Sequence, residues 1–331
     1  MERDRSRVTI HDVAREAGVS IATVSRVLSG SAGAGEHVRA RVLKIAEELG
    51  YRGDSVARSL RSRKSNMLGL LVPNITNPFF PALIQSVEGE LQVRRDGLLL
   101  ADAQSTVSVE TDRVRSLLDR RIDALLISPT DEEASQAIIS EALSQIPVVQ
   151  LDRRAGSAAP YVGVDNAGAI RDAVEHLVAQ GRSRFAFVGY SRGVSTSEAR
   201  VDAFVRHTRG IDAGSSARIL REEIGDGEDV PAAWLDAILG EVDAIITSSD
   251  LIAVSLRDSL FDRGLRVPED VALVSFDNTL LAAAANLTSI QQPLGDVARA
   301  GIGLVSGLSP EIPEEGFPTT LVVRKSSSAG T

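Results

Sequence analysis

The sequence contains no cysteine, which excludes a disulfide framework and thiolate chemistry. Aromatic residues make up only 4% of the 331 residues, and there is a single tryptophan. No apolar run approaches the roughly 18 residues that a membrane-spanning helix needs, and the opening MERDRSR is too charged for a secretory signal. With 43% hydrophobic and 24% charged residues, the chain is typical of a globular protein, and we expect it in the cytoplasm.

Signals of enzymatic chemistry are also scarce. The four histidines, His11, His37, His176 and His207, show no metal-ligand spacing, so we expect no metal and no cofactor. Residues 189–193, GYSRG, fit the G-x-S-x-G pattern of a hydrolase nucleophile after an apolar run. That chemistry needs an acid and then a histidine further along, and only His207 follows, early and within the next helical stretch. We therefore do not expect an enzyme.

Charge is distributed unevenly along the chain. Residues 1–64 contain 13 lysines and arginines against 8 acidic residues, whereas the whole chain contains 36 against 45 and has a net charge of -9. A basic head on an acidic body is typical of a head that contacts a polyanion. A random fluctuation in a short segment is the alternative.

Three helices are predicted in the basic head. The first apolar run with helical spacing begins after Thr9, which is placed to cap it, and ends at Gly18. Ser20 is placed as the N-cap of a second helix over 21–28, and a third helix is expected over about 36–49.

Two short helices joined by a tight glycine-containing turn and braced by a third are typical of a helix-turn-helix unit. The second helix has small residues on its outer face, so it fits a major groove, where Arg26 can contact guanine and Ile21 and Ala22 can contact base edges. An ordinary three-helix bundle with a solvated arginine is the alternative. The candidate DNA contacts of the head are Thr9, Ser20, Ile21, Ala22, Thr23, Ser25 and Arg26.

The segment DSVARSLRSRK, which begins at residue 54, is amphipathic and basic, and it is too short to form a stable helix alone in water. It is either a basic linker or a hinge that folds only on DNA and places an apolar wedge in the minor groove. The candidate DNA contacts here are Ser55, Ala57, Arg58 and Leu60.

From residue 66 onward, short apolar runs alternate with helical stretches. The apolar runs are MLGLLVP, GLLLADA, DALLISP, PVVQLD, YVGV, RFAFVGY, ARIL, DAIITSSD, VALVSFD and LVVRK. Buried strands that alternate with helices predict parallel sheets covered on both faces. Roughly ten strands are too many for one small sheet, so the sequence predicts two α/β lobes.

Polar residues follow several of these apolar runs. Because ligands of open α/β sheets bind at the carboxyl ends of strands, such side chains are candidates for binding a small molecule between the lobes. Each alone is more often a helix cap or a turn former, so the argument depends on their convergence. The candidates are Ser128, Asp152, Arg153, Ser249 and Asp277.

The motifs VTIHDVAREAGVSIATVSRVLSG, ELGYRGDSVARSLRS, LGLLVPNITNPFF, and VSFDN followed by LTSIQQP occur in an order that resembles the LacI/GalR family of bacterial transcription regulators. The resemblance covers nearly the whole chain. It implies that Ile21, Ala22 and Arg26 read bases, and that Ala57 and Leu60 contact the minor groove, with Leu60 as the intercalating residue.

The resemblance also implies a periplasmic-binding-protein-like body with three crossovers, near 163–165, 290–293 and 316–319. The implied domains are a helix-turn-helix domain over 1–52, a hinge over 53–65 and a body over 66–331, with lobe one at about 66–163 and 293–316 and lobe two at about 164–290 and 319–325. Phe79, Thr196 and Arg200 complete the candidate effector contacts, and the resemblance implies Phe79 and Arg200 among them.

The resulting hypothesis is a repressor whose affinity for a near-palindromic double-stranded operator depends on a small-molecule effector, a sugar or related metabolite. A sugar-binding protein or enzyme with an incidental basic head is the alternative. We expect a homodimer formed through 80–93 and 251–260, no contact with a membrane, and a mobile tail over the final residues SSSAGT.

Overall fold

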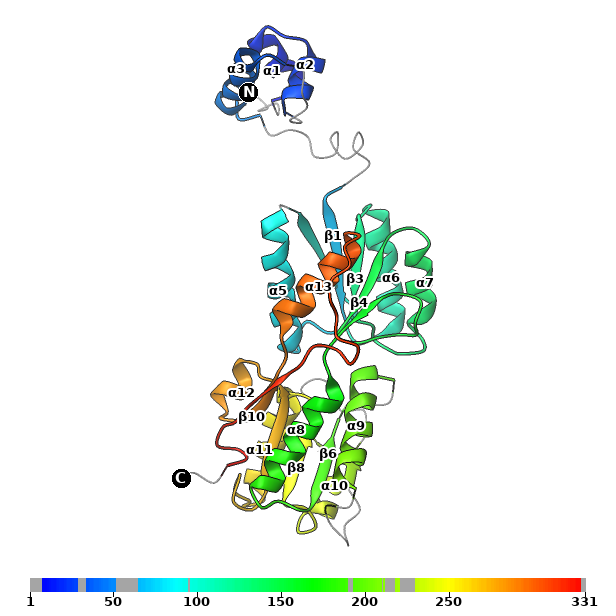
Figure 1. Cartoon of the computed structure of the whole chain (residues 1–331), viewed down its shortest axis with the longest axis vertical. Helices are drawn as coiled ribbons and strands as arrows, with labels where there is room; N and C mark the ends of the chain where they lie inside the picture. Colours follow the sequence, from blue (N-terminus) through cyan, green and yellow to red (C-terminus); the bar gives the residue numbers. More distant parts are fainter. Residues whose placement is uncertain are drawn as a thin grey trace, which may run out of the picture. The chain divides into compact units, whose positions relative to one another are not determined.

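The computed structural model describes residues 8–28, 34–51, 65–94, 96–189, 193–209, 211, 218–220 and 230–328. The chain forms two compact units, residues 1–65 and residues 66–331, whose elements are labelled in Figure 1. The hinge candidates Ser55, Ala57, Arg58 and Leu60 lie outside the described residues. Each unit has a hydrophobic core of its own.

The described part of the head contains the helices α1 (Ile10–Ala17), α2 (Ile21–Leu28) and α3 (Glu36–Glu48). Because apolar residues recur at helical spacing, each helix buries one face and leaves the other in solvent. The shared core comprises Val13, Ala14, Ala17, Val24, Val27, Val42 and Ala46. The structure agrees with the predicted helix bounds, with α3 ending one residue early.

Local sequence signals set the ends of these helices. The N–H and hydroxyl groups of Thr9 donate to Oδ2 of Asp12 at 3.0 and 2.7 Å. Gly18 has a φ of 62°, in the left-handed region that residues with a Cβ rarely adopt. The N–H of Thr23 donates to Oγ of Ser20 at 3.2 Å. The predicted caps at Thr9, Gly18 and Ser20 are confirmed.

Lobe one of the body contains a parallel sheet with the strand order β2-β1-β3-β4-β5. The strands are β1 (Met67–Val72), β2 (Gly97–Asp102), β3 (Ala124–Ile127), β4 (Val148–Leu151) and β5 (Tyr161–Val162). Helices α5 (Phe79–Arg94) and α13 (Leu294–Val305) cover one face, and α6 (Val107–Asp119) and α7 (Gln136–Leu143) cover the other. This double cover explains the nearly continuous apolar strands.

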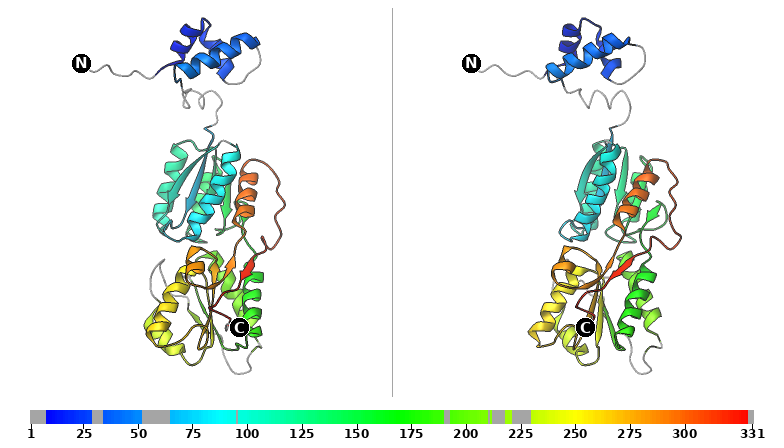
Figure 2. Two further views of the ribbon diagram at one scale, coloured as in Figure 1. Left: turned by 90° about the vertical axis from the view of Figure 1, so that its left-hand side faces the viewer. Right: turned by 60° about the vertical axis from the view of Figure 1, so that its left-hand side comes forward.

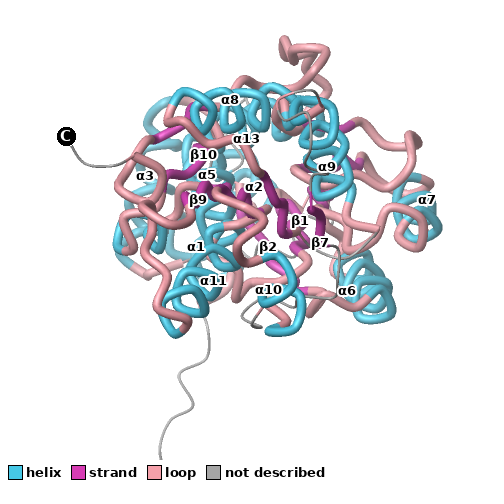
Figure 3. The backbone as a smooth tube through the Cα atoms, turned by 90° about the horizontal axis from the view of Figure 1, so that it is seen from below, coloured by secondary structure: helices cyan, strands magenta, loops and turns pink. Residues whose placement is uncertain are grey.

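Lobe two contains a sheet with the order β11-β10-β9-β8-β6-β7. Its strands are β6 (Phe185–Val188), β7 (Arg218–Leu220), β8 (Ala244–Thr247), β9 (Ala272–Asp277), β10 (Thr288–Gln291) and β11 (Thr320–Val322). Its helices are α8 (Asn166–Ala179), α9 (Ser195–Thr208), α10 (Ala232–Ile238), α11 (Asp250–Asp262) and α12 (Leu280–Ala284). Helices α8 and α9 pack on one face of the sheet, and α10 and α11 pack on the other (Figure 2). In Figure 3 the strands of the body run through the interior with helices around them.

The chain passes between the two lobes after β5, after β10 and before β11. The first and third passages lie side by side, because the N–H of Asp165 donates to the carbonyl of Phe317 at 2.9 Å. The third passage also includes Gly316, where a Cβ would lie 2.5 Å from the carbonyl carbon of Val164. The residue at which each crossover begins and ends, as predicted from the sequence, stays a prediction.

The structure refines one expectation from the sequence, the parallel sheets, and corrects another, the mobile tail. The last strand, β11, pairs with β10 in the antiparallel direction, so the lobe-two sheet is mixed. The tail is also partly ordered: Ser326 and Ser327 are 4% and 1% exposed. Oγ of Ser326 donates to the carbonyl of Leu273 at 2.6 Å, and Nε2 of His176 lies 2.7 Å from Oγ of Ser327. Because these two serines find buried partners in lobe two, they are held in its interior, whereas Ser328 is half-buried and 329–331 lie outside the described residues.

Candidate functional site

The outer face of α2 presents the side chains predicted to read DNA bases. Ile21 is 41% exposed, and Ala22 and Arg26 are exposed beside it, whereas Val24 and Val27 point into the core. Nε of Arg26 donates to the carbonyl of Ala22 at 3.3 Å. The remaining head candidates follow the same surface: Thr9 and Ser20 are exposed, and Thr23 and Ser25 are half-buried. A short helix with a small exposed face can enter a major groove.

The predicted effector site of the body centres on Arg200, which is only 4% exposed. Nε of Arg200 donates to Oδ1 of Asn166 at 2.8 Å, and one terminal nitrogen donates to the carbonyl of Ser248 at 2.7 Å. Its guanidinium lies over the ring of Phe276. Contacts from α8, the end of β8 and β9 therefore fix this buried cation in lobe two.

Asp277 is the last residue of β9 and has a φ of 102°, a strained value for a residue with a Cβ. Oδ1 accepts a hydrogen bond from Nε2 of Gln292 at 2.9 Å. Burial raises the pKa of Asp277 well above its usual range, the positive charge of Arg200 lowers it, and the carboxylates of Asp250 and Asp152 raise it further. Asp277 is half-buried by solvent exposure, and loss of water around its carboxyl is the main cause of its raised pKa.

The carboxyl of Asp152 lies at the end of β4 in lobe one. Burial raises the pKa of Asp152, and the positive charges of Arg153 and Arg200 lower it. Nε of Arg153 lies 3.9 Å from Oδ2 of Asp152, and its guanidinium lies over the ring of Phe80 at 5.5 Å. Arg200 therefore lowers the pKa of a carboxyl in each lobe, Asp152 at the end of β4 and Asp277 at the end of β9.

The other effector candidates occupy different positions. Ser128 is fully buried at the end of β3, and Thr196 is 6% exposed in the first turn of α9. Oγ of Ser249 accepts from the N–H of Ile252 at 3.3 Å, so Ser249 has a structural role as the N-cap of α11. Phe79 is 4% exposed and belongs to the core of lobe one.

Three side chains of the site had no role assigned from the sequence. Gln292 and Asn166 are 6% and 8% exposed and bond to Asp277 and Arg200. The hydroxyl of Tyr161 donates to the carbonyl of Asp152 at 2.8 Å, and burial raises its pKa. Gln292 belongs to the motif LTSIQQP and Asn166 follows the cap residue Asp165, but neither signal identifies a binding residue by itself.

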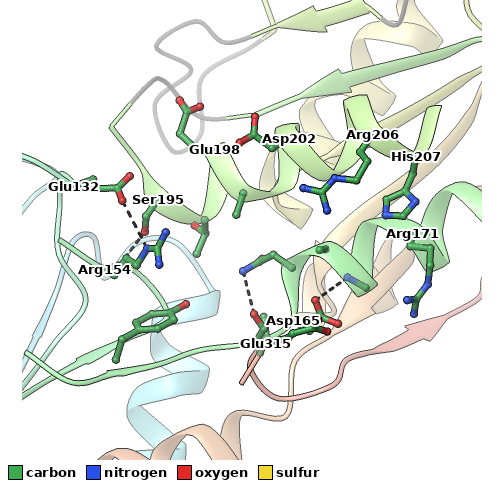
Figure 4. Close-up of a pocket in the computed structure, with 17 residues that line it drawn as sticks. Glu132, Arg154, Asp165, Arg171, Ser195, Glu198, Asp202, Arg206, His207 and Glu315 are labelled. Atoms are coloured by element: carbon green, nitrogen blue, oxygen red, sulfur yellow. Dashed lines mark hydrogen bonds and ion pairs between the residues drawn. The ribbon is translucent and has the colours of Figure 1, made fainter. Parts of the chain in front are cut away.

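A pocket of about 680 Å³ lies where the first turns of α8 and α9 meet lobe one, and Asn166, Tyr161 and Thr196 line part of it. At one end the lobes touch: the N–H of Glu132 donates to the carbonyl of Gly193 at 2.8 Å. The N–H of Arg154 donates to Oγ of Ser195 at 2.9 Å. Figure 4 shows Glu132, Arg154 and Ser195 together there. Of the predicted effector contacts, only Thr196 lines this pocket; Asp152, Arg200 and Asp277 are not among its lining residues.

Comparison with known proteins gives consistent matches over both units. Residues 9–54 match the family described as "Bacterial regulatory proteins, lacI family", and residues 174–327 match "Periplasmic binding protein-like domain". The chain is 31% identical to the ribose operon repressor of Halalkalibacterium halodurans over 97% of this chain and 98% of that protein. It is 30% identical to catabolite control protein A of Priestia megaterium over 90% of this chain and 92% of that protein.

Solved structures agree at the level of the fold. A lac repressor dimer bound to operator and an anti-inducer has a TM-score of 0.83 at 23% identity and covers 98% of this chain and 100% of its own. The complex of the transcriptional regulator CelR with cellobiose has a TM-score of 0.66 at 26% identity and covers 97% of this chain and 100% of its own. The chain therefore belongs to the LacI family of bacterial regulatory proteins and is a DNA-binding transcription regulator of the effector-modulated repressor type.

Proposed function

We propose that this repressor acts in the cytoplasm as a homodimer that binds a near-palindromic operator and changes its operator affinity when a sugar or related polar metabolite binds between its lobes. The proposal is supported mainly by one observation: the charge of Arg200 lowers the pKa of Asp152 in lobe one and of Asp277 in lobe two. The protein binds this effector and does not transform it.

The chemistry of the site supports a hydroxyl-rich ligand. The carboxylates of Asp152 and Asp277 accept hydrogen bonds, whereas the guanidinium groups of Arg153 and Arg200 donate them. Two acidic groups thus accompany two basic groups in the proposed site. A neutral polyol satisfies both kinds of partner without adding a charge to a desolvated site. Ser128, Thr196 and Ser249 are proposed as further polar contacts, and Phe79 as an apolar one.

In the head, we propose that Ile21, Ala22 and Arg26 contact base edges in the major groove. Four polar residues near these base contacts are proposed to bind the phosphate backbone and so position the helix. They are Thr9, Ser20, Thr23 and Ser25. Ser55, Ala57, Arg58 and Leu60 are proposed as hinge contacts in the minor groove.

Two heads are needed, because one α2 offers few base contacts. Val93 on α5 and Phe261 on α11 are 85% and 78% exposed, and burying these apolar side chains against a second copy would stabilise a dimer. We propose α5 and α11 as the dimer faces.

DNA binding is tested by selecting duplexes from a random library with the full-length protein and measuring fluorescence anisotropy at several salt concentrations. The proposal expects an enriched near-palindrome and an affinity that falls steeply as salt rises. Failure to enrich any sequence, together with no salt-sensitive binding, contradicts it.

Effector binding is tested by a thermal-shift screen of the full-length protein with sugars, polyols, nucleobases and sugar phosphates. D-ribose and cellobiose are included because they correspond to the named relatives. At least one polyhydroxylated compound should raise Tm for the wild type and not for Asp277→Ala, and should change operator anisotropy. A compound that raises the Tm of both proteins equally binds elsewhere.

A further inference from the structure

Gln292 lies where the chain leaves β10 and enters α13, and it bonds to both lobes. Its Nε2 donates to Oδ1 of Asp277 in lobe two at 2.9 Å. Its carbonyl oxygen accepts from the N–H of Leu294, at the start of α13 in lobe one, at 3.0 Å. Only 6% of Gln292 is exposed. One buried residue therefore joins a carboxylate of the proposed effector site to a segment that connects the lobes.

The turn after β9 needs such a partner. Asp277 and Asn278 have φ values of 102° and 49°, and two successive residues in this region are held only where the surroundings fix them. The N–H of Asn278 donates to Oγ of Ser289 at 2.9 Å, and Oγ of Ser289 donates to Oδ1 of Asp250 at 2.6 Å. These bonds fix the backbone of the turn, whereas Gln292 bonds to the carboxyl of Asp277 itself.

The charged groups that face this carboxyl come from three other elements. They are Arg200 on α9, Asp250 on α11 and Asp152 after β4. Arg200 favours the ionised form of Asp277, and the two other carboxylates oppose it. The hydrogen bond from Gln292 also lowers the pKa of Asp277, because an amide donor stabilises an ionised acceptor.

We propose that Gln292 is a positioning residue that orients the Asp277 carboxylate and transmits the state of that carboxylate to the crossover before α13. The inference rests on the proposed function for the assignment of Asp277 to the effector site. A ligand hydroxyl that reaches Oδ1 shares or displaces the amide of Gln292. Displacement of the Gln292 side-chain amide loosens the backbone at the start of α13. Effector binding is thereby linked to the position of the crossover between β10 and α13.

The hydrogen bond is tested without any ligand, in full-length protein labelled with ¹³C at aspartate carboxyls. The spectrum of Asp277→Asn identifies the Asp277 resonance, which is then followed by pH titration. Gln292→Met, which keeps length but has no donor, should shift the Asp277 titration to higher pH, and so should Gln292→Ala if the first variant folds poorly. Gln180→Met changes an exposed glutamine of the same lobe, at the end of α8, and should leave the titration unchanged. An unaltered titration in both Gln292 variants overturns the proposal.

Transmission is tested by hydrogen exchange of peptides that cover residues 290–296, corrected for the intrinsic effect of pH. Protection in the wild type should change across the pH range in which Asp277 titrates, and this change should be lost in Asp277→Asn and in Gln292→Met. A change that persists in Gln292→Met, or no change in the wild type, overturns the proposal. These measurements use neither DNA nor effector, so their failure is distinguishable from failure of the proposed function.

Discussion

The guanidinium carbon of Arg200 lies 3.5 Å from the centroid of the Phe276 ring. Phe276 is fully buried and directly precedes Asp277 on β9. The same strand therefore provides both the apolar face that holds this cation and the carboxylate that faces it. A desolvated contact of this kind is worth about 2 kcal/mol.

Replacing the ring should weaken the site without affecting the head. Phe276→Leu removes the aromatic face, so the effector found by the thermal-shift screen should bind with an affinity loss of about 2 kcal/mol, roughly thirtyfold in Kd. Isothermal titration calorimetry measures this change. Val178→Ala shortens an exposed side chain of the same lobe and serves as the control; similar affinities for the two variants would mean that the Phe276 ring does not support the site.

Removing the charge of Asp277 should change the pH dependence of Tm and abolish the operator response to effector. Because burial raises the pKa of Asp277 in the folded protein, ionisation disfavours folding, and wild-type stability falls as pH rises from the unfolded to the folded pKa. Asp277→Asn removes this loss, so its Tm relative to the wild type should be higher at pH 7 than at pH 4. The operator response to effector should be lost. A Tm difference that does not depend on pH would contradict a raised pKa of Asp277 in the folded protein.

A major-groove contact of Arg26 should be specific for sequence. Arg26→Ala should cost about 1–3 kcal/mol on the selected operator and relax the preference at one position of each half-site. Binding is measured by anisotropy on the operator and on a scrambled duplex. An equal loss on both duplexes would mean that Arg26 contacts only phosphate.

The buried tail should contribute to the stability of lobe two. Oγ of Ser326 accepts from the N–H of Thr288 at 2.8 Å and donates to the carbonyl of Leu273 at 2.6 Å. Ser326→Ala leaves both buried groups without this partner, so the free energy of unfolding should fall by about 1–3 kcal/mol. Urea unfolding measures it, with the exposed Ser140→Ala as control. Equal stability of the two variants would mean that the tail is not held as described.

The sequence predicts those parts of the fold that depend on neighbouring residues. Gly18 and Ser20 act within a single turn, and the apolar runs of β1 and β9 are long enough to identify alone. The prediction is poorer where distant segments pair. β10 has only four residues, three of them polar, and the antiparallel direction of β11 depends on where the last crossover returns to the sheet.

Prediction of the candidate site from sequence is also poorer where it depends on pairing between distant segments. Strand ends pointed to Asp152 and Asp277, because any strand end in such a sheet is a candidate. The role of Gln292 depends on the register between β9 and β10, which places Gln291 opposite Asp277 and the next residue beside its carboxyl. No local sequence pattern predicts that strand register, and the strained φ of Asp277 is known only from the structure.

The late return of the chain to both lobes has a consequence for biosynthesis. The head completes its core within the first 51 residues, whereas lobe one needs α13 and lobe two needs β11 and the buried serines near the C-terminus. At about 5–20 residues per second, the ribosome displays a finished head for many seconds before either lobe can close. Nascent body segments expose their apolar strands during that interval, which is when chaperones can protect them.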